Sequence, residues 1–255
     1  MAGSDSGAGA GIQADLKTCA ALGVYCTTAI TAVTAQNTMG VMAVHALPPE
    51  LVAAQIDAVV ADVRPDAVKT GMLASAGIIE VVAAKLREHS LPNVVVDPVM
   101  VAKSGDRLLA EDAAMALREL LLPLAEVVTP NIPEAEVLVG RSLQTDDEIR
   151  AAAREIHSMG ARNVVMKGGH REGDLAVDIL FNGRDFHEFS APRIQTTSTH
   201  GTGCTFASAI AAFLARGERV EQAVGHAKEY LTEALRNARP IGKGHGPVNH
   251  FWRWF

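Results

Sequence analysis

The stretch Thr199-His200-Gly201-Thr202-Gly203-Cys204-Thr205-Phe206-Ala207-Ser208 carries the strongest signal in this sequence. A Gly-Thr-Gly turn leads straight into an Ala-rich apolar run, which predicts a helix over Thr202–Ala215. The first turn of such a helix offers unpaired backbone N–H groups and the positive end of the helix dipole. We therefore expect an anion-binding site at this helix N-terminus, formed by Gly201, Thr202 and Gly203.

One reactive side chain, that of Cys204, lies just inside this expected anion site. A helix N-terminus favours the thiolate over the thiol, which predicts a pKa for Cys204 close enough to neutral pH for a base. An anion site that holds a base favours phosphoryl transfer, because that chemistry depends mainly on positioning and charge stabilisation. The structural alternative is that the glycines only shape a turn and that Cys204 is a small, inert core residue.

Short apolar runs alternate with longer helical patterns along the rest of the chain. The expected strands are Tyr25–Thr34, Val41–Ala46, Ala67–Thr70, Val94–Val99, Val127–Thr129, Val164–Lys167, Val177–Asn182 and Phe186–Ser190. The expected helices are Gly9–Ala21, Pro49–Val63, Ser75–His89, Glu111–Leu121, Pro133–Val139, Asp146–Met159, Thr202–Ala215 and Val220–Ala238. Strands separated by helices predict an α/β fold with a central, mostly parallel sheet and right-handed crossovers. Gly183-Arg184, between the last two strands, predicts a hairpin at one edge.

Composition limits the classes of protein to which the chain can belong. With 255 residues, 48% of them hydrophobic, the chain can build one substantial core, so we expect a single domain over residues 1–255. The net charge of −6 and the lack of a Lys/Arg-rich run argue against nucleic acid as the main partner. The three cysteines form no CxxC pair, no apolar run reaches roughly 18 residues, and no signal-peptide pattern is seen. We therefore expect a cytoplasmic protein that is not associated with a membrane.

Polar and glycine-bearing segments follow several of the expected strands. Asp97-Pro98 ends a strand whose consecutive valines, Val94-Val95-Val96, are typical of a strand covered on both faces. Thr129-Pro130-Asn131 and Lys167-Gly168-Gly169-His170 end two others. Ligands of open α/β sheets bind at the carboxyl ends of the strands. We therefore expect these segments to converge with the anion site on one edge of the sheet.

Two carboxylates and one ammonium group are expected at this edge. Asp97 and Glu134 offer the hard oxygen ligands that Mg²⁺ takes together with substrate phosphates. Lys167, followed by glycines, can neutralise phosphate charge without blocking the approach of the backbone. The alternatives are that Asp97 ends a strand, that Glu134 lies in the first turn of a helix, where acids are favoured, and that Lys167 is a solvated strand-end residue.

A second group of residues suits a small aromatic ring. The amide of Gln36 both donates and accepts hydrogen bonds, as a nitrogen heterocycle with an amino group requires. Apolar residues that can wall a slot near it are Ala10, Met72, Val99 and Met100. His200, beside the anion turn, and His170 are candidates for phosphate contacts. Turn chemistry at Gln36, core packing of the methionines and capping or solvated histidines are the alternatives.

The N-terminal segment Gly3-Ser4-Asp5-Ser6-Gly7-Ala8-Gly9-Ala10-Gly11 is dense in glycine and precedes an expected helix. Such a loop lets the backbone approach a ligand closely. It has neither the Gly-Lys-Ser/Thr of a P-loop nor a GxGxxG pattern, and a flexible terminus is the alternative.

Eight motifs along the chain occur in an order that is characteristic as a set. They are Ala2-Gly3-Ser4-Asp5, Ala10-Gly11-Ile12-Gln13-Ala14-Asp15-Leu16-Lys17, Thr34-Ala35-Gln36-Asn37-Thr38, Lys69-Thr70-Gly71-Met72-Leu73, Asp97-Pro98-Val99-Met100, Thr129-Pro130-Asn131-Ile132-Pro133-Glu134-Ala135, Met166-Lys167-Gly168-Gly169-His170 and His200-Gly201-Thr202-Gly203-Cys204-Thr205. With them, the sequence resembles hydroxymethylpyrimidine/hydroxymethylpyrimidine-phosphate kinases over nearly its whole length. Those are thiamine-biosynthesis enzymes of the ribokinase superfamily.

The resemblance implies a ribokinase-like fold, ATP and Mg²⁺ as cosubstrates, and a homodimer. It implies phosphorylation of 4-amino-5-hydroxymethyl-2-methylpyrimidine, and then of its monophosphate to the diphosphate. The residues that it assigns to the pyrimidine pocket are Gly3, Ala10, Asp15, Gln36, Met72 and Val99. It assigns the anion hole to the Gly201–Cys204 backbone, with Cys204 in the place of the superfamily's Asp base. It assigns nucleotide phosphate to Lys167 and Lys228, and Mg²⁺ to Asp97 and Glu134.

The chain departs from the family's pattern at its start. Members usually carry several apolar residues before Ala-Gly-Ser-Asp, and these form the first strand, so we expect this strand to be missing at the N-terminus. The alternative activity is that of a pyridoxal/pyridoxine kinase of the same cysteine-bearing subgroup, and Gln36 favours the pyrimidine over the pyridine. A catalytically silent protein that binds a vitamin precursor is the alternative from another class.

Overall fold

The computed structural model describes residues 1–100, 110–168 and 173–254. The strands are β1 (Ala2–Asp5), β2 (Ile30–Asn37), β3 (Gly40–Ala46), β4 (Val68–Thr70), β5 (Val94–Val96), β6 (Val127–Val128), β7 (Val164–Met166), β8 (Leu175–Phe181) and β9 (Phe186–Pro192). The α-helices are α1 (Gly11–Ala21), α2 (Pro49–Asp62), α3 (Ala76–Glu88), α4 (Glu111–Ala116), α5 (Ile132–Val139), α6 (Asp146–Ser158), α7 (Thr202–Ala215) and α8 (Val220–Arg236). Within the described ranges, no helix combines the length and the apolar character needed to span a bilayer.

The strands form two hydrogen-bonded groups, in the orders β1-β2-β3 and β4-β5-β6-β7-β8-β9. The pairs β1–β2, β4–β5, β5–β6 and β6–β7 are parallel, whereas β2–β3, β7–β8 and β8–β9 are antiparallel. Met1 joins the two groups, because its amino group donates to Lys69 O at 2.8 Å and its carbonyl accepts from Gly71 N at 2.9 Å. The mostly parallel sheet and the hairpin at one edge are confirmed.

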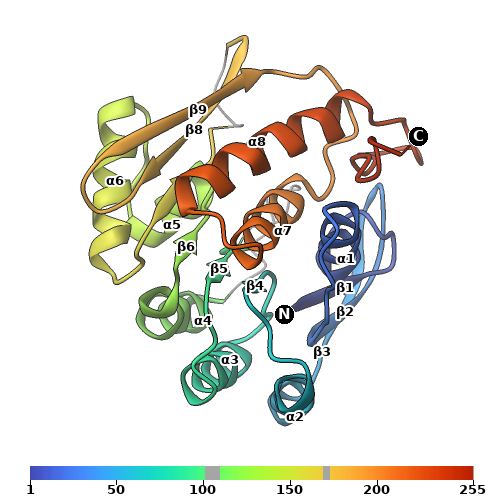
Figure 1. Cartoon of the computed structure of the whole chain (residues 1–255), viewed down its shortest axis with the longest axis vertical. Coiled ribbons are helices and arrows are strands. Elements are labelled where there is room, and N and C mark those ends of the chain that lie inside the picture. Colours follow the sequence, from blue (N-terminus) through green and yellow to red (C-terminus); the bar gives the residue numbers. More distant parts are fainter. Residues whose placement is uncertain (101–109, 169–172, 255) are drawn as a thin grey trace.

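Helices cover both faces of the sheet, and the side chains of β5 show how. Val94 and Val96 pack into the core shared with α2 to α6, whereas Val95 packs into the core shared with α1, α7 and α8. All three valines are buried, as their consecutive apolar run predicts. In Figure 1, α7 and α8 lie against each other in front of the strands, and α1 lies beside β1.

The N-terminal part of the sheet corrects two expectations. Gly3 to Asp5, expected as part of a glycine-rich loop, instead belong to the strand β1, which begins at Ala2. The expectation that a first strand is missing at the N-terminus stays a prediction. β2 begins at Ile30 rather than at Tyr25, because its parallel pairing with β1 starts where Ala2 lies opposite Ile30. Residues 25–29 instead line a cavity of about 430 Å³ between α1, α2, α7 and β4.

The helices match their expected ranges to within a few residues, apart from the segment expected over Glu111–Leu121. Only Glu111–Ala116 is α-helical there; Leu117–Leu121 has π-helical geometry and Leu122–Leu124 forms a 3-10 turn. Pro123 explains the end of this segment, because proline lacks the N–H that would continue the helical ladder.

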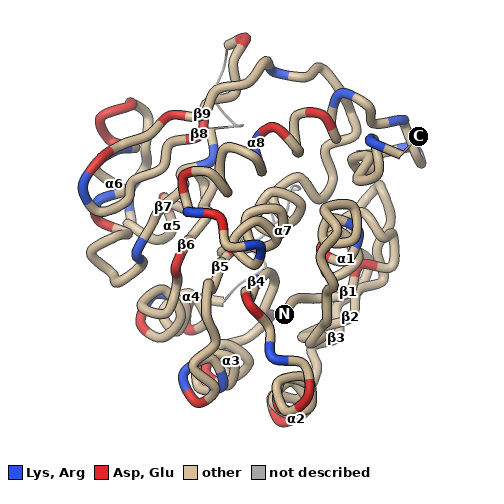
Figure 2. The backbone as a smooth tube through the Cα atoms, viewed as in Figure 1, with Lys and Arg blue, Asp and Glu red and all other residues tan. Residues whose placement is uncertain are grey.

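The helix α7 is the central helix of the fold. Charged side chains are spread over the outer helices and loops, and α7 has none (Figure 2). Its residues from Thr205 to Leu214 are buried. Its N-terminal turn, Thr202 to Cys204, is only partly covered, and this turn belongs to the site described next.

Candidate active site

The glycine turn predicted before α7 is present, with Gly201 in the left-handed conformation at φ 77°. A side chain at this position would collide with the loop before α1, since a Cβ on Gly201 would lie 1.8 Å from Gly9 O. The loop over residues 7–11 and the turn over residues 201–203 are therefore in backbone contact. The described side chains provide no cap to the first turn of α7, so its N–H groups remain available for an anion.

We expect Gly201→Ala to disrupt this contact and to weaken nucleotide binding with it. The left-handed conformation costs a non-glycine residue about 1–2 kcal/mol, and overpacking against Gly9 costs about 1–3 kcal/mol more in the free energy of unfolding. Gly217→Ala is the matched control, because Gly217 also has a positive φ but open space around its Cβ position. Urea denaturation and ADP titration of both variants measure the difference. Equal losses in the two variants would contradict the close packing at Gly201.

The predicted strand-end residues meet directly in front of this turn. Lys167 Nζ lies 2.8 Å from Asp97 Oδ1 and 3.6 Å from Glu134 Oε2. Thr129 Oγ1 donates to Asp97 Oδ1 at 3.3 Å. A Cβ on Gly203 would lie 3.4 Å from Lys167 Nζ and 3.6 Å from Asp97 Oδ2, so the first turn of α7 contacts this cluster. The convergence predicted at the carboxyl edge of the sheet is therefore confirmed for these residues.

The charges of this cluster are unbalanced. Burial, opposed by the Lys167 ammonium and reinforced by the Asp97 carboxylate, raises the pKa of Glu134 to about 7. Burial alone would lower the pKa of Lys167, yet the two carboxylates raise it above its ordinary value. Two carboxylates thus face one ammonium, and a further cation would restore the balance when both are ionised. Asp97 and Glu134 therefore fit Mg²⁺, which binds through one or two carboxylates and substrate phosphates.

Glu134 also lies in the first turn of a helix, which is the structural alternative given for this residue. Glu134 Oε2 accepts the N–H of Asn131 at 2.8 Å, and the Asn131 side chain accepts the N–H of Glu134 at 2.8 Å. This reciprocal pair is a capping box at the start of α5. It holds the Glu134 carboxylate at the strand-end edge, so its role in the helix and a role toward a cation are compatible.

Cys204 lies in the first turn of α7, as predicted, and is partly exposed. The prediction of a pKa close to neutral for Cys204 is wrong. Desolvation of the sulfur raises the pKa of Cys204 to about 11, and the Asp15 and Asp97 carboxylates raise it while the Lys69 ammonium opposes them. Desolvation therefore favours the thiol of Cys204, in the direction opposite to the effect expected of a helix N-terminus.

Two buried side chains, those of Lys69 and Ser208, donate hydrogen bonds to the carboxylate of Asp15. Its Oδ1 accepts from Lys69 Nζ at 2.9 Å and from Ser208 Oγ at 2.6 Å, and all three residues are buried. Burial would lower the pKa of Lys69, but Asp15 and then Cys204 raise it above the ordinary range. Asp15 thus fixes an ammonium group that is electrostatically coupled to Cys204.

The other residues expected around a ring lie at the start of β1 and at the strand ends. A Cβ on Gly3 would lie 2.5 Å from Met72 Cε, so these two residues are in contact. Val99 is partly exposed next to Asp97, whose carbonyl accepts its N–H at 2.8 Å. Met100 is 2% exposed and belongs to the hydrophobic core, which is the structural alternative for that residue.

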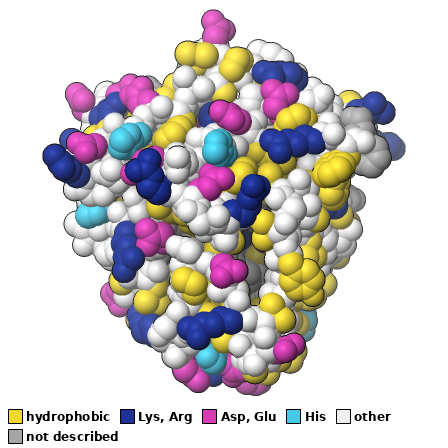
Figure 3. Space-filling model, in the orientation of Figure 1, with side chains coloured by type: hydrophobic (Ala, Val, Ile, Leu, Met, Phe, Trp, Pro, Cys, Tyr) yellow, Lys and Arg dark blue, Asp and Glu magenta, His cyan; other side chains and the backbone are white. Residues whose placement is uncertain are grey.

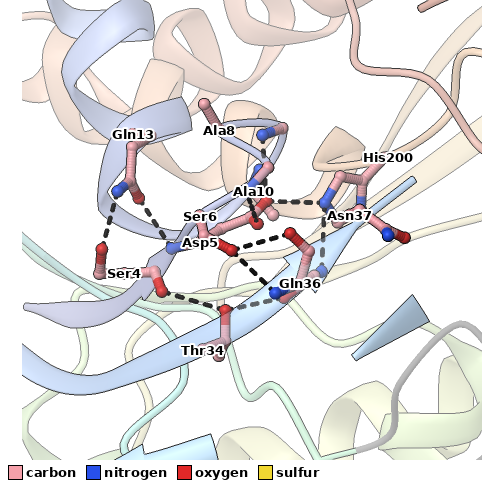
Figure 4. A network of polar contacts seen from close by, with 12 residues as sticks. Ser4, Asp5, Ser6, Ala8, Ala10, Gln13, Thr34, Gln36, Asn37 and His200 are labelled. Carbon is pink, nitrogen blue, oxygen red and sulfur yellow. Dashed lines mark hydrogen bonds and ion pairs between the residues drawn. The ribbon is translucent and has the colours of Figure 1, made fainter. Parts of the chain in front are cut away.

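Gln36 and His200 come together with a residue that the sequence analysis did not single out, Asp5 (Figure 4). Asp5 accepts the N–H groups of Gly7, Gly9 and Ala10 at 2.8–3.0 Å, and its Oδ2 lies 2.8 Å from His200 Nε2. Burial would raise the pKa of Asp5, but His200 and the amides lower it to about 2. The signal that could have identified Asp5 is the Asp-Ser-Gly sequence, since Asp side chains accept the N–H two residues later in turns.

In the described part of the chain, Lys228 does not contact the strand-end cluster directly, and one residue, Asp178, lies between them. Its Nζ is paired at 2.8 Å with Asp178 Oδ2 in β8, and both groups are largely buried. Asp178 Oδ1 accepts the N–H of Gly168, next to Lys167, at 2.8 Å. Lys228 is thus connected to the strand-end edge through Asp178. Gly169 and His170 lie outside the described residues.

On the face of the molecule seen in Figure 3, Lys and Arg side chains alternate with Asp and Glu side chains. The exposed large apolar residues include several on the β2–β3 hairpin: Val33, Met39, Val41, Met42 and Val44. Charge of one sign therefore does not dominate this face, and the hairpin exposes several large apolar side chains.

Solved structures resemble this chain over nearly its full length. The ADP complex of Bacillus subtilis pyridoxal kinase has a TM-score of 0.93 and 42% identity, and the match covers 100% of this chain and 97% of that one. A phosphomethylpyrimidine kinase from Clostridium difficile has a TM-score of 0.82 and 45% identity, covering 91% of this chain and 96% of that one. These matches show a ribokinase-like fold, shared with kinases that act on small molecules.

Sequence comparisons show the family. The family model for Phosphomethylpyrimidine kinase matches residues 5–249. The hydroxymethylpyrimidine/phosphomethylpyrimidine kinase of Bacillus subtilis is 51% identical over 252 residues, which cover 98% of this chain and 93% of that protein. The chain belongs to the phosphomethylpyrimidine kinase family.

One relative is considerably longer than this chain. The thiamine biosynthesis bifunctional protein ThiED of Geobacter sulfurreducens is 57% identical over 250 residues, which cover 98% of this chain and 51% of that protein. The chain therefore spans about half the length of this bifunctional relative.

Proposed function

We propose that this chain is a hydroxymethylpyrimidine/phosphomethylpyrimidine kinase of thiamine biosynthesis. It transfers the terminal phosphoryl group of ATP to the hydroxymethyl group of 4-amino-5-hydroxymethyl-2-methylpyrimidine, and then phosphorylates the monophosphate to the diphosphate. The observation that carries this proposal is the contact of the uncapped first turn of α7 with the Lys167–Asp97–Glu134 cluster on one side and with the glycine loop of residues 7–11 on the other. The kinase names of its relatives support it.

In this proposal, the anion hole is the backbone of Gly201, Thr202, Gly203 and Cys204. Its N–H groups stabilise the charge that spreads over the oxygens of the transferred phosphoryl group. Phosphoryl transfer passes through a loose transition state, so the attacking hydroxyl needs its proton removed only late. Cys204, at the centre of this turn, accepts that proton in its thiolate form as the O–P bond forms and the bond to the leaving phosphate breaks.

Lys167 neutralises charge on the nucleotide phosphates, with Lys228 and His200 as further candidates for phosphate contacts. ATP as the donor is supported by the ADP complex of the Bacillus subtilis pyridoxal kinase and by the AMP-PCP complex of the Staphylococcus aureus pyridoxal kinase. Mg²⁺ would be held by Asp97 and Glu134 and would neutralise phosphate charge at that point.

The ring pocket of this proposal consists of Gly3, Ala10, Asp15, Gln36, Met72 and Val99. Gly3 and Met72 supply an apolar wall, and the Gln36 amide supplies one donor and one acceptor in the plane of the ring. Asp15 acts through Lys69, because it holds at 2.9 Å the ammonium group that is electrostatically coupled to Cys204.

Pyridoxal is the second candidate substrate. It is favoured by the TM-score of 0.93 to a pyridoxal kinase, which exceeds the 0.82 to the phosphomethylpyrimidine kinase from Clostridium difficile. The two rings share a hydroxymethyl group, and a common pocket separates such substrates by only a few kcal/mol unless buried polar groups are left unpaired.

Turnover of ATP with Mg²⁺, measured separately with the hydroxymethylpyrimidine, its monophosphate and pyridoxal, tests the proposal. We expect the pyrimidine to be converted to the diphosphate, and EDTA to abolish the reaction. Turnover of pyridoxal alone would favour the second candidate and would show that Gln36 does not discriminate. No turnover of any of the three would contradict the kinase activity.

We also propose that the chain forms a homodimer through the β2–β3 hairpin. All residues of β3 are exposed, and Val41, Met42 and Val44 leave apolar area uncovered on this edge of the sheet. An exposed apolar strand at a sheet edge is an unfavourable surface for an isolated protein, and a second copy would cover it.

A further inference from the structure

The carboxylate of Asp5 determines which ring nitrogen of His200 carries a proton. Asp5 is 2% exposed, accepts three backbone N–H groups and has a pKa near 2, so it is an anion that can only accept hydrogen bonds. His200 Nε2 lies 2.8 Å from Asp5 Oδ2. Nε2 must therefore carry a proton and donate it to Asp5. The ring of His200 is also fixed in place, because a Cβ on Gly9 would lie 2.2 Å from its Cδ2.

The side chain of Gln36 has its two ends in contact with two different groups. One end lies 3.3 Å from His200 Nε2 and the other lies 3.1 Å from Thr34 Oγ1. With the amide nitrogen of Gln36 toward His200, the N–H groups of the amide and of His200 Nε2 would face each other, and neither could accept a hydrogen bond. The oxygen and nitrogen of an amide are assigned from the hydrogen-bond network, so the network decides between the two orientations.

The rotated amide satisfies every group in this network. The oxygen of Gln36 then accepts a second, longer hydrogen bond from the N–H at His200 Nε2, which also donates to Asp5. Its nitrogen donates to Thr34 Oγ1, whose own proton goes to the carbonyl of Ser4 at 3.1 Å. Each donor in the chain from Ser4 to Asp5 then faces an acceptor.

We propose that Asp5 and His200 together fix the Gln36 amide with its oxygen toward His200, and thereby select rings that carry an amino group beside a ring nitrogen. The inference rests on the proposed function. An amide held in one orientation presents one remaining acceptor and one remaining donor in a fixed order. An amino group donates to the oxygen while the ring nitrogen accepts from the amide N–H. In pyridoxal the aldehyde oxygen takes the place of the amino group, because both are on the ring carbon next to the one that bears the hydroxymethyl group. This oxygen would face the amide oxygen with no proton between them.

Asp5 and His200 are positioning residues in this inference, since they act on the substrate through Gln36. An unconstrained Gln36 would rotate and accept either kind of ring. Discrimination that depends on an unpaired buried polar group is large, whereas discrimination by shape alone is small. Loss of the constraint should therefore appear in the ratio of the two substrates rather than in the overall rate.

The experiment measures kcat/KM for the hydroxymethylpyrimidine and for pyridoxal in Asp5→Asn and His200→Asn. The asparagine amide in Asp5→Asn can donate to His200 Nε2, which reverses the order of donors along the chain. We expect the pyrimidine-to-pyridoxal ratio to fall about tenfold or more in both variants, with the KM for ATP nearly unchanged in Asp5→Asn. His245→Asn is the matched control, because His245 contacts Thr199 on the same loop and is exposed. An unchanged ratio with a raised KM for ATP in His200→Asn would overturn the inference and would make His200 a phosphate ligand.

A second measurement does not depend on activity. The ¹⁵N NMR spectrum of histidine-labelled protein, with His200 assigned by its loss in His200→Asn, reports the protonation of each ring nitrogen. We expect a protonated Nε2 in the wild type from pH 6 to 8, and a changed Nε2 signal in Asp5→Asn. An unprotonated Nε2 in the wild type would overturn the inference even if the kinase activity is confirmed. A protonated Nε2 in an enzyme without turnover would locate the failure in the proposed function instead.

Discussion

Cys204→Ala is expected to lower kcat about 100-fold or more, while the KM values for ATP and for the pyrimidine change by less than about threefold. The side chain lies at the centre of the uncapped turn of α7, where the reacting hydroxyl and the phosphoryl group would meet. Removing a proton acceptor affects the transition state and leaves ground-state binding intact. Steady-state kinetics of the purified variant measure both constants.

The pH dependence of kcat/KM tests whether the thiolate of Cys204 is the proton acceptor. Desolvation raises the pKa of Cys204 to about 11, so the thiolate fraction grows about tenfold with each pH unit between 7 and 10. If the thiolate of the free enzyme is the active form, kcat/KM of the wild type rises over this range, and the alanine variant loses the rise. Cys26→Ala is the matched control, because Cys26 lines the cavity beside β4, and the α7 residues that line this cavity begin at Ser208, beyond the first turn of the helix. Near-normal turnover of Cys204→Ala would remove this residue from the proton transfer.

Lys167→Met is expected to lower the free energy of unfolding by about 3–5 kcal/mol at pH 8, because it leaves the buried carboxylates of Asp97 and Glu134 without their cation. The pKa of Glu134 is already raised from 4.5 to about 7. A carboxyl group with a raised folded pKa contributes stability below its unfolded value of 4.5 and loses it as the pH rises toward 7. Without Lys167 this pKa rises further, so the variant loses more stability at pH 8 than at pH 5.5.

Urea denaturation at the two pH values, with and without Mg²⁺, measures this effect. If Asp97 and Glu134 hold the metal, Mg²⁺ restores part of the lost stability, since it binds only the folded protein. Lys85→Met is the matched control, because Lys85 also pairs with two carboxylates, Asp57 and Glu88, but at the surface, where its removal should change little. Equal losses in the two variants at both pH values would contradict a buried, charge-coupled cluster.

The elements of this fold follow from local sequence patterns, and so does the edge of the sheet where the site lies. The valines of β5 and the apolar run of α7 are buried as expected, and Asp97, Glu134 and Lys167 meet because carboxyl ends of parallel strands share one edge. The start of β2 at Ile30 was not predictable in this way. It depends on the register with β1, which is a tertiary property.

The electrostatics of the site were also outside the reach of local patterns. The sequence places Cys204 at a helix N-terminus but does not show that the Asp15 and Asp97 carboxylates raise the pKa of its thiol. Asp5 was missed because its most informative partner, His200, lies 195 residues away along the chain. A pKa and a hydrogen-bond network both depend on which distant groups the fold brings together.

The link at Met1 has a consequence for how substrates are brought together. Gly3 and Gln36, which the proposed function assigns to the acceptor ring, belong to the group β1–β3, whereas Asp97 and Lys167 follow strands of the other group. The strands of the two groups are joined through the backbone hydrogen bonds of Met1, and the helices α1 and α7 pack against each other across the junction. The distance between the acceptor hydroxyl and the donor phosphate therefore depends on this junction, where Met1 and the packing of α1 on α7 set the two groups of strands relative to each other.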